Sequence, residues 1–122
     1  MNWRALLRDV VLLFLLTGVG GFLFGFFAAA GGTEPSIPLL AVINVGLMIV
    51  GFSISGSLTR IRRVWHLFAV ATLTWVLSLV NLLFGTAPQE WLLSGIGVLF
   101  SCAVGGAISA LLFRAAPGSP AP

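Results

Sequence analysis

Charge is scarce in this chain, and its scarcity decides the class of protein. Of 122 residues, six are basic, every one of them arginine, and three are acidic, so 7% are charged and 59% are hydrophobic. A soluble domain usually carries about 25% charged residues. The mean hydropathy is +1.15. A water-soluble fold of this length could not bury so much apolar surface, and we therefore expect lipid to surround the protein.

The residues that build catalytic and metal sites are also few. Cys102 is the only cysteine, which excludes an intrachain disulfide, and His66 is the only histidine. No second histidine, cysteine cluster or close pair of carboxylates accompanies them to form a metal or acid–base site. We interpret His66, beside Trp65 near one membrane surface, as an interfacial residue. The sequence therefore predicts no enzyme, no cofactor and no metal.

Four long apolar segments make up most of the chain, at about residues 10–30, 37–58, 64–84 and 91–113. Each is long enough to cross a bilayer as a helix, which takes about 20 residues. Strands are not expected, because an open strand edge would stay unpaired in lipid. We predict an all-α integral membrane protein with one four-helix domain over 1–114, followed by a disordered tail at 115–122.

The breaks between the segments agree with this division. "GGTEPSIP" at 31–38 and "GTAPQE" at 85–90 hold the glycine, proline and polar residues that suit turns. The first apolar stretch is longer than the 7 to 15 residues of a typical signal-peptide core, so we expect it to stay in the protein. No predicted span contains Asp, Glu, Lys or Arg between its ends. Proton-coupled carriers and ion pumps normally place such a group there, so both classes are disfavoured.

The arginines are distributed very unevenly. With four spans, all of them fall on the side that holds the chain ends and the 59–63 turn, and none falls on the other side. They are Arg4, Arg8, Arg60, Arg62, Arg63 and Arg114. Short loops rich in basic residues stay cytoplasmic, so we expect both termini in the cytoplasm. Use of arginine without lysine favours a GC-rich bacterial genome and hence a bacterial inner membrane.

The "RIRR" run could alternatively form a patch that binds anionic lipid or nucleic acid. The run is short for a dedicated site of this kind, and we expect no nucleic-acid partner.

Small residues recur on one face of two predicted helices, at spacings of three and four. They are Gly18, Gly21 and Gly25 in the first helix, and Gly97, Ser101, Gly105 and Ser109 in the fourth. In membranes such faces let helix backbones approach closely. They serve either packing inside the bundle or a seam for another subunit, and the sequence leaves both open.

A few polar side chains lie within the predicted spans: Asn44, Thr74, Ser78 and Asn81. Asn44 and Ser78 fall at similar depths, roughly 10 Å inside the boundary at 1.5 Å per residue. We predict that the Asn44 amide bonds to Ser78 or Asn81 and joins the second and third helices. The alternative is a polar lining for a substrate or ion path. Trp75 lies within the third span, where we expect it to pack against small residues.

A shift of 54 residues aligns the first predicted hairpin with the second. Arg8, Val10, Leu13 and Phe14 fall on Arg62, Val64, Leu67 and Phe68, and "GFSISGSLTR" at 51–60 falls on "GGAISALLFR" at 105–114. Both copies enter the membrane from the same side, so we interpret the pattern as a parallel duplication of a two-helix hairpin.

The leading functional hypothesis is a small non-enzymatic subunit that packs against copies of itself or against other membrane subunits. The alternative is a small oligomeric channel or uniporter-like carrier with a polar path in the outer leaflet.

Overall fold

The computed structural model describes residues 2–34, 36–59 and 61–113, and within these ranges every regular element is helical. The elements are α1 (Trp3–Ala30), α2 (Ile37–Leu58), α3 (Arg63–Leu77), the 3-10 helix η1 (Ser78–Phe84) and α4 (Pro88–Leu112). Four stretches are long and apolar enough to cross a membrane, with η1 continuing the third. The protein is thus an all-α bundle with the composition of a multi-pass membrane protein. Arg60, Arg114 and the tail at 115–122, to which the sequence assigned roles, lie outside the described residues.

The helix ends follow from local capping groups. The Asn2 side-chain oxygen accepts hydrogen bonds from the backbone amides of Arg4 and Ala5, at 3.1 and 3.3 Å, so α1 begins at Trp3 rather than near residue 10. Ser36 caps α2 in the same way, and Pro38 fits its first turn, where a proline costs no hydrogen bond. The early start of α1 has a consequence for the site, because it puts Asp9 inside a helix.

The third span changes its winding near the loop end. It is an α-helix to Leu77 and a 3-10 helix from Ser78 to Phe84. At the junction the Trp91 indole donates to the Trp75 carbonyl oxygen at 3.2 Å and to Ser78 Oγ at 2.9 Å. Side-chain donors that compete for a helical carbonyl favour such a local change of winding. The continuous α-helix expected over 64–84 is therefore wrong in its last two turns.

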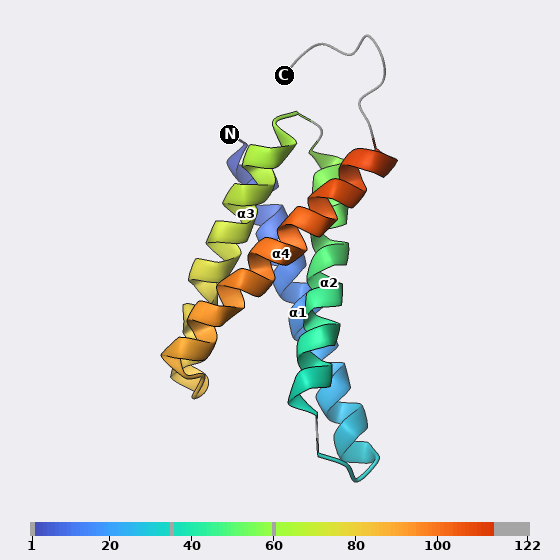
Figure 1. Cartoon of the computed structure of the whole chain (residues 1–122), viewed down its shortest axis with the longest axis vertical. Helices are drawn as coiled ribbons and strands as arrows, with labels where there is room; N and C mark the ends of the chain where they lie inside the picture. Colours follow the sequence, from blue (N-terminus) through green and yellow to red (C-terminus); the bar gives the residue numbers. More distant parts are fainter. Residues whose placement is uncertain (1, 35, 60, 114–122) are drawn as a thin grey trace.

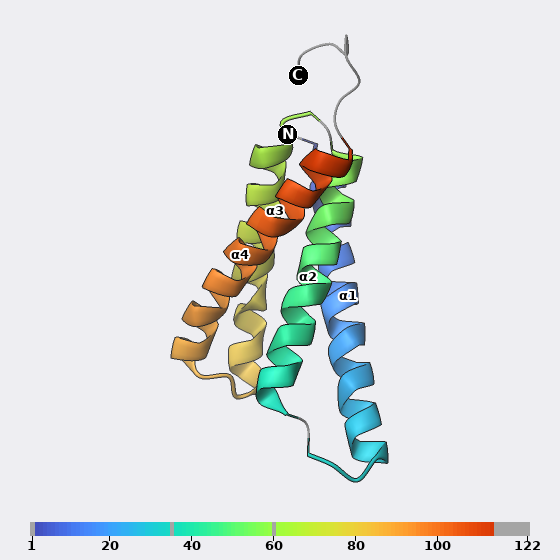
Figure 2. The same cartoon turned by 45° about the vertical axis from the view of Figure 1, so that its right-hand side comes forward.

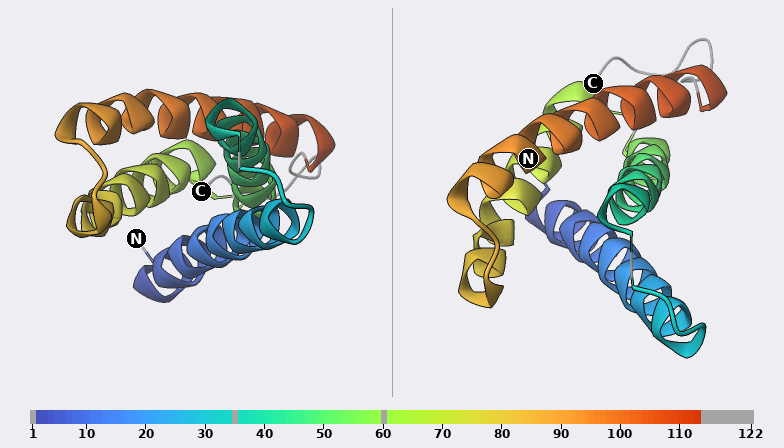
Figure 3. Two further views of the ribbon diagram at one scale, coloured as in Figure 1. Left: turned by 90° about the horizontal axis from the view of Figure 1, so that it is seen from below. Right: turned by 60° about the horizontal axis from the view of Figure 1, so that its bottom comes forward.

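The two hairpins form a wedge. The α1–α2 and α3–α4 hairpins lie close together at the end where the chain starts and diverge toward the 31–36 and 85–87 loops (Figure 1, Figure 2). The most extensive contact is between α2 and α4, and α1 contacts α2 and α3 (Figure 3). Within the described residues the backbones of α1 and α4 do not approach each other closely, with no pair of Cα atoms within 8 Å. The wedge therefore has a closed half near the chain ends and an open half near the loops.

Burial follows the wedge. The buried apolar side chains are Leu6, Val10, Leu13, Met48, Phe52, Leu67, Val70, Ala71 and Val98. Of the described residues in 14–47 and 75–94, none is buried. The outer surface is strongly apolar, with Phe22 71% and Leu83 84% exposed. An exterior of this kind matches a hydrocarbon solvent, since lipid removes the usual cost of exposing such side chains.

Candidate functional site

A carboxylate is buried at the centre of the closed half. Asp9 lies two turns into α1, on the face that also carries Leu6, Val10 and Leu13, and its side chain is fully buried. Residues three and four apart share a helix face, so this register directs Asp9 into the bundle with the apolar side chains. A charge taken out of water is costly unless it is paired and hydrogen-bonded. Its partners therefore decide whether the arrangement is stable.

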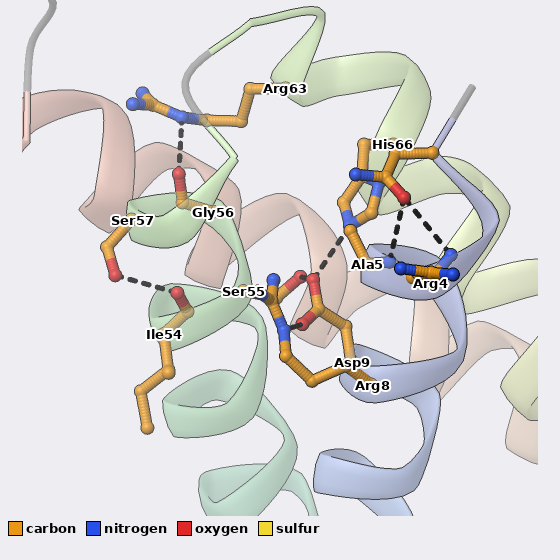
Figure 4. Close-up of polar contacts among 11 residues, drawn as sticks. Arg4, Ala5, Arg8, Asp9, Ile54, Ser55, Gly56, Ser57, Arg63 and His66 are labelled. Atoms are coloured by element: carbon orange, nitrogen blue, oxygen red, sulfur yellow. Dashed lines mark hydrogen bonds and ion pairs between the residues drawn. The ribbon is translucent and has the colours of Figure 1, made fainter.

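Three donors from three helices satisfy the Asp9 carboxylate. Arg8 Nε donates to Oδ1 at 2.6 Å, and Ser55 Oγ of α2 donates to Oδ2 at 2.6 Å. Nε2 of His66, from α3, lies 2.7 Å from the same Oδ2 (Figure 4). Both carboxylate oxygens are thus engaged, and the cluster ties α1, α2 and α3 together at one point. We call these residues, Arg8, Asp9, Ser55 and His66, the Asp9 cluster.

The cluster fixes how His66 carries its proton. Asp9 is paired with Arg8 and acts as an acceptor, so the proton of the short contact belongs to His66 Nε2. In the neutral imidazole this leaves Nδ1 with the free lone pair. His66 is only 5% exposed, yet it lines an open hollow at the end of the bundle where the chain starts. A carboxylate that orients an imidazole in this way fixes its tautomer.

The hollow has a volume of about 1080 Å³ and lies at the end where α1 and α3 begin and α2 ends. Its walls come from the first turns of α1, the end of α2, the turn before α3 and the first turn of α3. They comprise Asn2, Ala5, Arg8, Leu58, Thr59, Ile61, Arg62, Trp65 and His66. Arg62 has a left-handed backbone, with φ of 51°, which is uncommon for a residue with a side chain. Two arginines and an imidazole therefore face one open space.

Arg63, the next residue, turns to another task. Its Nε donates to the Gly56 carbonyl oxygen at 2.8 Å, and a terminal nitrogen donates to the Phe113 carbonyl oxygen at 2.7 Å. These carbonyls lie at the carboxyl ends of α2 and α4, where orphan acceptors and the helix dipole favour a cation. The Arg63 side chain thus links the carboxyl ends of α2 and α4. The described arginines of the topology prediction, Arg4, Arg8, Arg62 and Arg63, all lie toward this end of the bundle.

A tryptophan pair holds the second hairpin at the opposite end. The Trp75 and Trp91 rings stack with centroids 4.3 Å apart and planes 6° apart. Trp75 Nε1 donates to the Trp91 carbonyl oxygen at 3.1 Å, and Trp91 returns the bond. A Cβ atom on Gly95 would come within 2.9 Å of the Trp75 ring. The expectation that Trp75 packs against a small residue is confirmed.

The predicted hydrogen bond from Asn44 to Ser78 or Asn81 is wrong. The α2 helix has no contact with η1 within the described residues, since the hairpins diverge there. Ser78 bonds within its own hairpin, donating to the Trp75 carbonyl at 2.5 Å. Thr74 is buried, and its hydroxyl has no hydrogen-bond partner in the part of the chain that the structure describes. In the described part of the chain, Asn44 therefore has no hydrogen bond to Ser78 or Asn81.

The two faces of small residues have different surroundings. On α4, Ser101 and Ser109 are fully buried, and a Cβ on Gly105 would come within 2.6 Å of Phe52 Cβ. This face packs inside the bundle, against α2. On α1, a Cβ on any of the three glycines would meet nothing within 4 Å, and the same holds for Gly97 of α4. The three are Gly18, Gly21 and Gly25.

The Asp9 cluster was missed from the sequence. His66 was interpreted as an interfacial residue with no particular partner, and the structure corrects this, because His66 is 5% exposed and lies 2.7 Å from the buried Asp9 carboxylate. Asp9 falls just before the predicted first span of 10–30, and the sequence pattern assigned it no role. Two signals were available: Asp9 continues the helical spacing of Leu6 and Leu13, and it is the only carboxylate on the arginine-rich side.

No family model, curated protein or solved structure matches this chain. Within residues 2–34, 36–59 and 61–113, no three His, Cys, Asp or Glu side chains gather to hold a metal ion. The chemistry of the site therefore follows from the groups present: cations around a hollow, and an imidazole held by a buried carboxylate.

Proposed function

We propose that this protein is a non-enzymatic, multi-pass protein of a bacterial inner membrane that packs against further membrane-spanning helices, either of a second copy or of another subunit. The observation that carries the proposal is the open half of the wedge, in which no described residue is buried. Lipid tails are as apolar as these side chains, so close backbone contact drives helix association. The closed half supplies a rigid base for that contact.

The glycines of α1 make this half suited to close contact. Gly18, Gly21 and Gly25 face open space, while comparable small residues of α4 are already used within the bundle. A small-residue face lets a neighbouring backbone approach and gain van der Waals contact along its length. These glycines support a seam for another helix rather than an internal role.

The orientation is part of the proposal. The chain ends, with their arginines, face the cytoplasm, and the opposite end, with Glu34 in its loop and Glu90 in the first turn of α4, faces outward. Arg4 and Arg62 lie at the end of the bundle where the helices converge. Basic residues in short segments oppose translocation across the membrane, which supports this orientation. A reporter fused to each loop tests it, and an outward-facing 59–63 turn would contradict it.

Association is tested by gentle detergent extraction followed by mass measurement of the particle and identification of its components. We expect a complex larger than one chain, and Gly21→Leu should dissociate it while the helix content is kept. Val19→Leu, also on the exposed surface of α1, is the matched control and should leave the complex intact. Recovery of the unaltered protein as a strict monomer with no companion would contradict the proposal.

A second candidate is an oligomeric channel or uniporter-like carrier. The observation that favours it is the shape: the wedge opens at the loop end, the hollow opens at the other, and the closed core with its unpaired Thr74 hydroxyl lies between. In this role Asn44 and Asn81 would line the outer part of the path. Replacing both by leucine should abolish flux in liposomes without unfolding the protein, and unchanged flux would remove this candidate.

The burial pattern supports the proposed duplication. Leu13 and Leu67 occupy corresponding positions under the 54-residue shift, and both are buried. Gly51 and Gly105, as well as Ser55 and Ser109, are buried pairs in the same register. The Asp9 cluster breaks this symmetry, because Arg63 occupies the position that corresponds to Asp9. One copy thus contributes a buried carboxylate, and the other contributes a cation that bonds to two helix ends.

A further inference from the structure

We propose that the hollow beside the Asp9 cluster binds a phosphate group, with Arg8 and Arg62 as its principal contacts. The site is separate from the proposed packing seam, which lies on the other half of the wedge. The proposal therefore does not depend on whether the protein associates with other helices.

The balance of charge in the hollow is positive. Arg8 and Arg62 line it, and no carboxylate is among its lining residues. The nearest acid, Asp9, is fully buried, and both of its oxygens are already engaged by hydrogen-bond donors. The other two acids lie at the far end of the bundle, Glu34 in the loop before α2 and Glu90 in the first turn of α4. An anion that enters the hollow therefore meets the donors of two guanidinium groups, and the one nearby carboxylate is buried behind Arg8 and His66.

Asp9 also prepares Arg8 for such an anion. It holds the Nε group of Arg8 at 2.6 Å, while half of the Arg8 side chain stays exposed along the hollow. A guanidinium has five N–H donors, so the contact to Asp9 leaves the two terminal nitrogens for a ligand. A planar group already fixed in orientation loses less entropy when it binds phosphate through two nitrogens.

Arg62 adds a second cation from a different element. Arg62 has a left-handed backbone, with φ of 51°. The next residue, Arg63, is used differently, because its side chain bonds to the Gly56 and Phe113 carbonyls. Arg62 lines the hollow, where no described residue forms a salt bridge with it. Of the adjacent arginines, one therefore stabilises the bundle and the other is available to a ligand.

His66 supplies a polar group at the base of the hollow. It is 5% exposed, its Nε2 is committed to Asp9, and Nδ1 has no hydrogen-bond partner among the described residues. In the neutral tautomer Nδ1 accepts a hydrogen bond from a hydroxyl, and in the protonated ring it donates to an anionic oxygen. Thr59 and Asn2 add neutral hydrogen-bonding groups. The hollow thus matches a phosphate that carries or neighbours a hydroxyl.

Two sources of phosphate fit this chemistry: the headgroup of an anionic phospholipid and a free soluble phosphate. The hollow lies at one end of the spanning helices, beside Trp65, which is 74% exposed and suits the headgroup region. One arm of the test is native mass spectrometry of the whole protein with phosphatidylglycerol or phosphatidylcholine. The other is thermal stabilisation of the protein in phosphatidylcholine nanodiscs by inorganic phosphate. The same sulfate-free buffer without phosphate is the reference.

The variants separate a built site from general attraction to a basic surface. Arg62→Asn removes the cation while keeping a residue that tolerates the left-handed backbone. We expect it to weaken binding about ten-fold, the effect of one charge-assisted contact. Arg4→Gln, on the same end but outside the hollow, is the matched control and should change binding less than two-fold. Thr59→Asp puts a negative charge in the hollow and should abolish binding. Thr59→Asn, which has the shape of the aspartate variant without its charge, should retain binding.

Each outcome decides the proposal. Preferential binding of phosphatidylglycerol that is lost in Arg62→Asn assigns the site to a lipid headgroup, and saturable stabilisation by phosphate assigns it to a soluble ligand. Equal losses in Arg62→Asn and Arg4→Gln would overturn the proposal, since they would indicate only surface electrostatics. Absence of binding in both arms would overturn it as well.

Discussion

The two halves of the wedge use similar residues for opposite purposes. In the half near the chain ends, small residues such as Gly105 and Ser109 let α2 and α4 pack closely against each other. In the half near the loops, Gly18 and Gly21 repeat at the same kind of spacing, but a Cβ atom at either position would meet nothing within 4 Å. Spacing alone therefore does not tell whether a small-residue face is used within a chain. What distinguishes the halves is a polar anchor, since the Asp9 cluster joins three helices only in the closed half.

The largest effect is expected from removing that anchor. Asp9→Ala leaves the buried donors of Ser55 and His66 without their shared acceptor, at about 1–3 kcal/mol each, while the half-exposed Arg8 can be solvated, so we expect a total loss of about 3–5 kcal/mol. The free energy of unfolding, measured by helix loss during SDS titration in mixed micelles, should fall by that amount. Glu34→Ala, in the exposed loop, is the control and should change it by less than about 0.5 kcal/mol. A loss below about 1 kcal/mol for Asp9→Ala would show that the cluster does not hold the closed half.

The second test exchanges glycine for leucine in each half. Gly105→Leu places a side chain where Phe52 Cβ lies 2.6 Å and the Ile49 carbonyl oxygen 2.8 Å from the new Cβ. Backbone atoms cannot move aside cheaply, so we expect a loss of about 3 kcal/mol, at the upper end of overpacking effects. Gly21→Leu meets open space and should leave the unfolding free energy of the isolated chain unchanged. If both variants lost stability equally, the difference between the halves would be disproved.

The tryptophan pair should give a smaller effect, confined to the second hairpin. Trp91→Phe keeps an aromatic ring for stacking on Trp75 but removes the N–H that bonds to the Trp75 carbonyl and to Ser78. Loss of such bonds costs about 1 kcal/mol. We also expect faster amide hydrogen exchange over 78–84, measured by mass spectrometry. Trp3→Phe, at an exposed position, is the control, and equal exchange in the two variants would contradict a role for the indole.

How much could be predicted from the sequence differs between the fold and the site. Hydropathy and length predicted four apolar helices, because the bilayer imposes both on any spanning segment. The start of α1 was placed too late, since the apolar run was used as its boundary and the Asn2 cap was overlooked. That error made Asp9 a flanking charge. His66 could not be paired with it from the sequence alone, because the pairing depends on how α1 and α3 pack.

The smallest effect is expected at Asn44, and it sharpens the comparison from the open side. Asn44 is half-buried, and no hydrogen bond joins it to Ser78 or Asn81, since the hairpins have separated at that level. Had the amide joined two helices as the sequence predicted, Asn44→Leu would cost about 0.6 kcal/mol. With the wedge open, leucine replaces an unpaired amide in an apolar setting, so the unfolding free energy should stay level or rise by a few tenths of a kcal/mol. Ser55→Ala, which removes a donor from the closed half, is the matched polar deletion and should cost about 1–2 kcal/mol. A loss at Asn44 as large as that at Ser55 would mean that the hairpins meet at the loop end in the membrane, and the closed and open halves would then be one continuous bundle.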